Sequence, residues 1–206
     1  MMETEQHNPH HIYTVGEHTI RSMQYIRADK VLRLTMLLHD VAKPVCRTED
    51  ENGIHHFHGH PQVGAEMSRK ILRRLKFDND TIHRVMALVR AHDEGRSVRR
   101  AIYRNGTEQY PELFEVKRAD ILAQSSFLQQ EKLLYVDRYE HMYQQIMEKE
   151  QCLSLKELAV NGSDLIARGI QPGKEIGEIL HQMLEKVLEE PELNEKEVLL
   201  AWYFKA

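Results

Sequence analysis

The chain has 206 residues, the usual size of one domain or of one domain with an extension. Its composition, with 41% hydrophobic and 29% charged residues and only ten Gly and six Pro, excludes a disordered chain and a membrane protein and disfavours a loop-rich β fold. The net charge is −4, but the charged residues are unevenly distributed. Residues 69–104 carry eleven Lys or Arg and four Asp or Glu, whereas residues 140–206 carry seven Lys or Arg and thirteen Asp or Glu.

Helices are predicted at the start of the chain. Thr14 and Glu17, three residues apart, form a capping box that opens a helix over residues 14–28. A second, densely apolar helix is predicted over residues 31–43, where it ends because Pro44 disfavours helical backbone in the residue before it.

A loop and two further helices are expected next. Residues 45–60 contain an acidic run with Asn and Gly and four histidines, so a loop is predicted there. Pro61 suits the first turn of a helix over residues 61–77. Asp80 is predicted to cap a fourth helix, which ends near His92.

The second half of the chain is also predicted to be helical. A fifth helix is expected between Ser97 and Asn105, and residues 113–147 form one long amphipathic stretch. Apolar residues over 174–190 trace one helix face in the tail. No segment alternates apolar and polar residues with period two, so no sheet is predicted and the fold class is all-α.

Membrane insertion and secretion are not expected. The longest unbroken apolar run, residues 198–204, has seven residues, whereas a membrane span needs about 20. The first residues lack the charged-then-apolar order of a signal peptide. Cys46 and Cys152 are isolated, so neither a disulfide framework nor a cysteine zinc site is predicted. We therefore expect a cytoplasmic protein.

Histidine is abundant and concentrated near the start of the chain, where nine of the 13 lie in the first 60 residues. Five places put His or Asp at or near the ends of predicted helices: His18, the pair His39-Asp40, His60, His92 and Asp120. Imidazole and carboxylate together suit first-row transition metals, and the lack of Cys argues against a closed structural zinc site. On a helix His39 and Asp40 point about 100° apart, so they can serve one ion while the carboxylate bridges to a second.

These residues belong to an ordered set of motifs. The set comprises His18, Leu37-Leu38-His39-Asp40-Val41-Ala42-Lys43-Pro44, His60, His92 and Ala119-Asp120. It resembles the HD-domain superfamily of metal-dependent phosphohydrolases. More closely, residues 8–19, 57–65 and 161–165 resemble the HD region in the C-terminal half of bacterial CCA-adding tRNA nucleotidyltransferases, and the resemblance spans residues 8–200.

The catalytic head of those transferases has no counterpart in the sequence. They carry a Gly-Ser pair followed by Asp-x-Asp on a sheet, whereas the only Asp-x-Asp here, at residues 78–80, lies in a predicted helix–helix turn without that pair. Nucleotide addition is therefore not expected. The resemblance implies an HD-domain helical bundle with phosphohydrolase chemistry over residues 1–150 and a helical C-terminal extension packed on it over residues 151–206.

The resemblance also implies roles for the candidate residues. His18, His39, Asp40 and Asp120 would form a core metal site, and His60 and His92 would complete a second one. The cofactor would be a divalent transition metal, Fe, Mn, Co, Ni or Zn, present as two ions or as one. Structural alternatives remain: Asp120 can cap a helix, His60 can be an ordinary loop residue, and His92 can interact with a helix dipole.

Catalysis and substrate binding are assigned to residues beside the metal pair and in the basic region. Asp40, Lys43 and His92 are the catalytic candidates, because Lys43 lies one turn beyond the pair and can hold a phosphate as a point charge. The substrate-binding candidates are Lys43, His58, Arg96, Arg99 and Arg100. Arg96 and Arg100 are four residues apart, so they share a helix face and can form a basic strip. A solvent-exposed basic helix surface explains this strip almost as well as phosphate binding does.

The leading hypothesis is a divalent-metal-dependent phosphohydrolase, either a phosphatase or a phosphodiesterase, acting on a nucleotide or RNA-terminal phosphoester. By the resemblance, 2′-nucleotides and 2′,3′-cyclic phosphates are the first substrates to test. No DNA-specific binding and no membrane partner are expected. The alternative is a non-catalytic RNA-binding or partner module, derived from the rear half of a tRNA nucleotidyltransferase.

Overall fold

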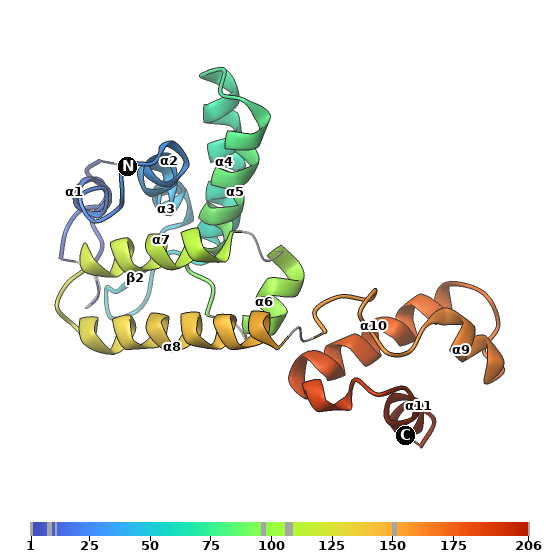
Figure 1. Ribbon diagram of the computed structural model, residues 1–206. Helices are drawn as coiled ribbons and strands as arrows, with labels where there is room; N and C mark the ends of the chain where they lie inside the picture. Colours follow the sequence, from blue (N-terminus) through green and yellow to red (C-terminus); the bar gives the residue numbers. More distant parts are fainter. Residues whose placement is uncertain are drawn as a thin grey trace. The chain divides into compact units, whose positions relative to one another are not determined.

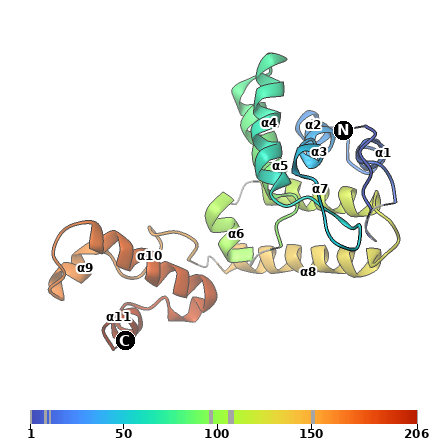
Figure 2. The ribbon, with the colours of Figure 1, turned by 180° about the vertical axis from the view of Figure 1, so that it is seen from behind.

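The computed structural model describes residues 2–7, 10, 12–95, 98–105, 109–149 and 152–205, and only the backbone of residues 104, 105 and 205. The protein is mostly helical, which confirms the predicted all-α fold class (Figures 1 and 2). No helix within these described ranges is both long and apolar enough to cross a membrane.

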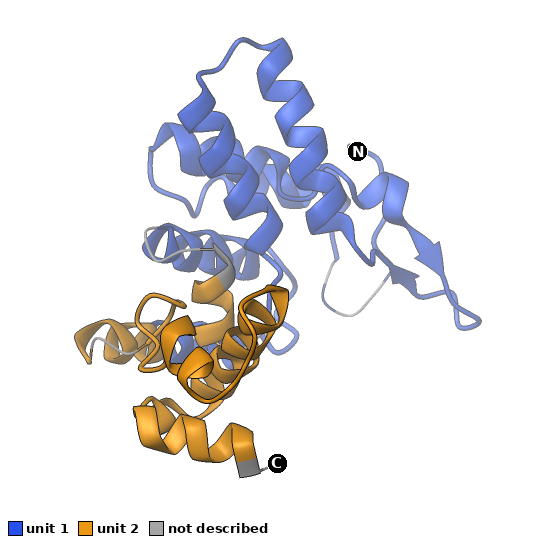
Figure 3. Cartoon of the chain, turned by 90° about the vertical axis from the view of Figure 1, so that its right-hand side faces the viewer, with its two compact units in different colours: residues 1–95, 108–140 blue, residues 96–107, 141–206 orange. Residues whose placement is uncertain are grey.

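The chain forms two compact units, coloured separately in Figure 3. Unit 1 comprises Met1–Gly95 and Glu108–Glu140, and unit 2 comprises Arg96–Thr107 and His141–Ala206. The chain therefore passes from unit 1 into unit 2 twice. The predicted domain boundary at residue 150 stays a prediction.

Unit 1 contains most of the helices. They are α1 (Val15–Ser22), α2 (Lys30–Leu38), α3 (Lys43–Cys46), α4 (His60–Arg74), α5 (Asn79–Ala91), α7 (Tyr110–Leu122) and the first part of α8 (Gln129–Glu148). The predicted capping box opens α1: Thr14 Oγ1 accepts from the Glu17 N–H and Glu17 Oε2 accepts from the Thr14 N–H, both at 3.2 Å. Local hydrogen bonding thus fixes the start of this helix.

Two helix boundaries differ from the prediction. Helix α2 ends at Leu38, and Pro44 lies in the first turn of α3, where its missing N–H and fixed φ are tolerated. Helix α5 is capped by Asp78 rather than Asp80, because Asp78 Oδ1 accepts from the N–H of Thr81 at 2.8 Å. Asp80 lies in the first turn instead.

Two features absent from the prediction lie in the expected loop and in the expected long helix. Strands β1 (Thr48–Glu49) and β2 (His55–His56) form an antiparallel hairpin. In its turn Asp50 Oδ1 accepts hydrogen bonds from the backbone N–H groups of Asn52 and Ile54. Strands of two residues are too short to show an alternating pattern. The stretch 113–147 is divided into α7 and α8, and Leu128 before α8 has a φ of +52°.

The core of unit 1 lies among four helices. Helices α4 and α5 pack side by side, and α2 packs against both α5 and α7 (Figure 1). The largest fully buried side chains are Leu32 and Met36 of α2, Leu72 of α4, Leu88 of α5, and Tyr110 and Phe114 of α7. Their packing brings the end of α2, the start of α4 and the end of α5 to one place.

Unit 2 has a core of its own. Its elements are α6 (Val98–Asn105), the end of α8, α9 (Gly162–Ala167), α10 (Lys174–Glu189), the 3₁₀ helix η1 (Pro191–Leu193) and α11 (Lys196–Lys205). The apolar face predicted for the tail helix is buried at Ile179, Met183, Leu184, Val187 and Leu188. Leu165 of α9 and Leu199 of α11 pack in the same cluster.

Candidate metal centre

Five helices of unit 1 supply the polar side chains of one cluster. The side chains of this cluster are His18 of α1, His39 and Asp40 directly after α2, His60 at the start of α4, His92 directly after α5, and Asp120 of α7. The first five are at most 6% exposed, and the side chain of Asp120 is 18% exposed. The structure therefore brings together all six residues that the sequence indicated as metal ligands.

Four of these side chains form a first group of ligand atoms. His18 Nε2 lies 3.2 Å from His39 Nε2. Asp120 Oδ1 lies 2.8 Å from His18 Nε2 and 3.6 Å from His39 Nε2. Asp40 Oδ2 lies 3.3 Å from His39 Nε2 and 3.6 Å from His18 Nε2. His18, His39 and Asp40 thus offer three ligand atoms close enough together to hold a metal ion, and Asp120 lies against the two imidazoles; nitrogen and carboxylate oxygen are donors that suit a divalent transition metal.

A second group shares Asp40 with the first. His60 Nε2 and His92 Nε2 are 3.2 Å apart, and Asp40 Oδ1 lies 3.5 Å from the former and 3.8 Å from the latter. The two oxygens of Asp40 therefore face different groups. A carboxylate placed in this way can contribute one oxygen to each group.

Backbone carbonyls orient all four imidazole rings. The Nδ1 atoms of His39, His60 and His92 lie 2.7–2.8 Å from the carbonyl oxygens of Met36, Phe57 and Val89, and His18 Nδ1 lies 3.3 Å from that of Ala123. A carbonyl can only accept, so each Nδ1 carries the hydrogen. In a neutral ring Nε2 is then unprotonated and directs its lone pair into the cluster. Metal-binding histidines are oriented in the same way, by a hydrogen bond from the ring nitrogen that does not bind the metal.

The chemistry of the donor atoms fits a cation in the second group. Burial lowers the pKa of His60, and burial together with the His39 charge lowers the pKa of His92 to about 3. Both rings are therefore neutral, and their Nε2 lone pairs face each other with no proton between them. Asp40 Oδ1 is buried without a hydrogen-bond partner in the described part of the chain. A divalent ion satisfies all three atoms.

In the first group a proton takes the place of a cation. Burial opposes a charge on His39, but the carboxylates of Asp40 and Asp120 outweigh it and raise the pKa of this imidazole to about 10. The metal-free protein therefore holds an imidazolium between two carboxylates. Metal binding requires the neutral ring, so an ion entering here displaces that proton.

Lys43 lies against the centre and is buried, with 5% of its surface exposed. Its ammonium group is 2.8 Å from Asp40 Oδ2 and donates to Gln6 Oε1 at 2.7 Å. The amide of Gln6 donates in turn to the carbonyl oxygen of Tyr13 at 3.2 Å. Gln6 was not indicated by the sequence, since only the folded N-terminal segment brings it to Lys43.

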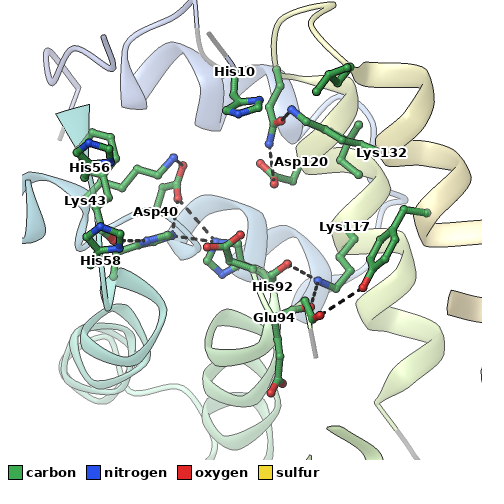
Figure 4. A pocket seen from close by; sticks show the side chains of 18 of the residues that line it. His10, Asp40, Lys43, His56, His58, His92, Glu94, Lys117, Asp120 and Lys132 are labelled. Atoms are coloured by element: carbon green, nitrogen blue, oxygen red, sulfur yellow. Dashed lines mark hydrogen bonds and ion pairs between the residues drawn. The ribbon is translucent and has the colours of Figure 1, made fainter. Parts of the chain in front are cut away.

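The centre opens into a cavity of about 850 Å³ whose walls Figure 4 shows. Lys43 and His58, two of the predicted substrate-binding residues, line it. His58 is exposed at the rim, and its ring stacks on that of His56 with centroids 5.5 Å apart. A cavity of this size accommodates a ligand of nucleotide size.

The lining residues that the sequence interpretation missed include Lys117, Gln124 and Lys132. Lys117 and Gln124 lie three residues before and four residues after Asp120, so helical periodicity from that aspartate would have indicated them. Lys132 gave no such signal, because it reaches the cavity only through the turn between α7 and α8.

The predicted arginines lie elsewhere or outside the described residues. Arg96 is not among the described residues. Arg99 and Arg100 belong to α6 of unit 2, and Arg100 forms ion pairs with Glu185 and Glu189 of α10. Neither is among the described residues that line the cavity. Their role in substrate binding stays a prediction.

Comparisons with known proteins place these residues in a family context. Residues 48–203 match the model of the family described as tRNA nucleotidyltransferase domain 2. The chain is 32% identical over 187 residues to the CC-adding tRNA nucleotidyltransferase of Thermus thermophilus, and 31% identical over 190 residues to the A-adding tRNA nucleotidyltransferase of Deinococcus radiodurans. Each alignment covers 85% of this chain but only 41% and 43% of those relatives. The chain thus spans about two fifths of the length of the curated relatives it matches.

Proposed function

The chain belongs to the tRNA nucleotidyltransferase domain 2 family, and we propose that it acts as a divalent-metal-dependent phosphohydrolase on a nucleotide or RNA-terminal phosphoester. One observation carries the proposal: two groups of buried ligand atoms share Asp40 at the floor of a nucleotide-sized cavity. The proposed HD-domain character rests on the same six residues.

The residues of the chain divide the work of such a site. His18, His39 and Asp120 would hold one ion, His60 and His92 the other, and Asp40 both. Bound ions would lower the pKa of water and neutralise charge on the phosphoryl oxygens. Lys43 holds a positive charge beside Asp40, where it would stabilise the negative charge that develops on the phosphoryl group.

The family and the cavity both support the proposed substrate class. The relatives are named as tRNA nucleotidyltransferases, which supports an RNA end or a nucleotide as the ligand. Phosphatase and phosphodiesterase activities both fit the two ligand groups, since ions held there would supply the same chemistry to either reaction, an activated water and charge stabilisation at phosphorus. The product distinguishes them, because a phosphatase releases inorganic phosphate whereas a phosphodiesterase leaves a phosphomonoester.

A combined metal and activity measurement tests the proposal. Protein purified without a histidine tag is analysed for metal content and then assayed on a panel of 2′-nucleotides, 2′,3′-cyclic nucleotides and simple phosphomonoesters, with Asp40→Asn as the matched inactive variant. We expect bound transition metal and turnover that the variant lacks. A chain that binds RNA but neither metal nor phosphoester would be the non-catalytic module instead.

A further inference from the structure

Lys132 is a cation of the cavity wall that the metal centre does not use. It lies in the first turn of α8, and its Nζ donates to Gln124 Oε1 at 2.6 Å. Gln124 Nε2 donates in turn to Asp120 Oδ2 at 3.0 Å. In the described ranges no carboxylate lies within ion-pair distance of Lys132. Among the described residues the hydrogen-bond acceptor of its ammonium group is a neutral amide oxygen, and Asp120 acts on it electrostatically from beyond Gln124, so its charge can also serve a ligand.

Lys132 and Lys43 lie at opposite ends of a chain of contacts through the first ligand group. Lys43 contacts Asp40, and Lys132 reaches Asp120 through Gln124. Figure 4 shows Lys43 beside Asp40 on one side and Lys132 beside Asp120 on the other. A phosphoester placed over the metal centre would thus have one ammonium group on each side.

The third lysine of the cavity has a different role. Lys117 donates to the carbonyl oxygens of His92 and Glu94 at 2.8 and 2.9 Å, so its ammonium group is committed to the C-terminal end of α5. Positive charge near the last carbonyls of a helix is favourable in itself. Lys132 caps no helix end in this way, and a structural role explains it less well.

The part of the cavity that contains Lys132 combines polar side chains, among them His10, Gln124 and Glu131, with an apolar surface. Ile121, Leu128 and Val136 line this end of the cavity, together with the half-exposed ring of Tyr135. Apolar and aromatic surface beside an isolated ammonium group suits a flat base or sugar that carries a phosphate. Glu131 lines the same region, so attraction of an anion depends on the Lys132 ammonium itself.

We propose that Lys132, held by Gln124, binds a second phosphate of the substrate, one nucleoside away from the phosphoester at the metal centre. The ligand class is then a nucleoside bisphosphate or the phosphorylated end of an RNA strand, because in both of these two phosphates are separated by one nucleoside. The inference rests on the proposed function for the position of the first phosphate. It assigns Lys132 as a specificity-determining residue and Gln124 as its positioning residue.

Equilibrium binding tests the subsite separately from catalysis. The affinities of adenosine 3′-phosphate, adenosine 3′,5′-bisphosphate and a 3′-phosphorylated diadenosine are measured on the wild-type chain by calorimetry, and hydrolysis is assayed in parallel. We expect the two ligands with a second phosphate to bind about tenfold more tightly than the first, since one charge-assisted hydrogen bond is added.

Four variants locate the effect. Lys132→Gln should abolish the preference, Lys132→Arg should keep most of it, and Glu131→Gln should leave or strengthen it. Arg138→Ala is the matched control, because Arg138 is an exposed cation of the same helix outside the described cavity lining. It should leave all affinities unchanged.

The outcomes separate the two proposals. Hydrolysis with a preference that Lys132→Gln does not alter would overturn the subsite and leave the phosphohydrolase intact. A preference abolished by Lys132→Gln without any hydrolysis would support the subsite and overturn the phosphohydrolase. If only the bisphosphate gains affinity, the ligand is a mononucleotide; if only the dinucleotide gains, it is an RNA end. No preference in the wild-type chain overturns the subsite.

Discussion

Replacing Asp40 by Asn is expected to remove metal binding and to destabilise the metal-free protein at the same time. The carboxylate is 1% exposed and lies 2.8 Å from the ammonium of Lys43 and 3.3 Å from His39 Nε2. Burial raises the pKa of Asp40, but the charges of His39 and Lys43 outweigh it and hold the pKa well below its usual range. Asp40 is therefore ionised and neutralises two buried cations.

The magnitude follows from what the variant leaves behind. Without the carboxylate, Lys43 keeps a neutral amide oxygen of Gln6 as its close partner, although its side chain is only 6% exposed. Removing one partner of a buried ion pair costs roughly 3–5 kcal/mol. For a chain of this size the melting temperature should fall by roughly 10 °C.

A double variant distinguishes this charge effect from a general loss of packing. Thermal unfolding is followed in the presence of a chelator, and metal content is measured on separate samples. Asp40→Asn/Lys43→Met removes both charges, so it should regain most of the lost stability but no metal. Asp80→Asn is the control, because the Asp80 side chain is 79% exposed and should affect neither quantity. An Asp40→Asn protein that melts at the wild-type temperature, or that retains two ions, would refute the reasoning.

Three further predictions concern the same centre. The double variant His60→Ala/His92→Ala should retain at most one ion per chain by elemental analysis, and two retained ions would remove these residues from the ligand set. Binding of a metal ion to the first group near pH 8 should release about one proton per chain, since the pKa of His39 is about 10. The metal affinity of this group should rise about tenfold per pH unit up to that pKa. Calorimetry in buffers of different ionisation enthalpy measures the released protons, and metal binding without proton release would contradict this prediction. Gln6→Ala should lower the free energy of unfolding by about 1–3 kcal/mol, because the buried ammonium of Lys43 loses an acceptor; unchanged denaturant unfolding would contradict this.

Local signals made much of the fold predictable. The capping box of Thr14 and Glu17 opens α1 as expected, because both partners lie within one turn. The limits of that approach show at Asp78 and Asp80, two residues that can each cap a helix. Only the position of the Thr81 N–H decides between them.

The residues of the site could be predicted where they belong to sequence motifs. They could not be predicted where only tertiary contacts bring them to the centre. His39 and Asp40 are adjacent in sequence, and their neighbours in the cluster were indicated by ordered motifs. Lys132 and Gln6 reach the centre through the α7–α8 turn and the N-terminal segment, so no spacing in the sequence relates them to it. Arg100, in contrast, has the spacing of a basic strip but forms ion pairs with α10.

Charge balance explains why the two ligand groups should differ although they share Asp40. In the metal-free protein the carboxylates of Asp40 and Asp120 are balanced by the cations of His39 and Lys43. A divalent ion in the first group replaces one proton and adds a single positive charge, whereas an ion in the second group meets neutral imidazoles and adds two. A second ion would therefore add more positive charge near Lys43 than the first, and we expect an anion in the cavity to favour its binding. A phosphoester supplies this charge, and by reciprocity the second ion strengthens phosphoester binding by the same factor.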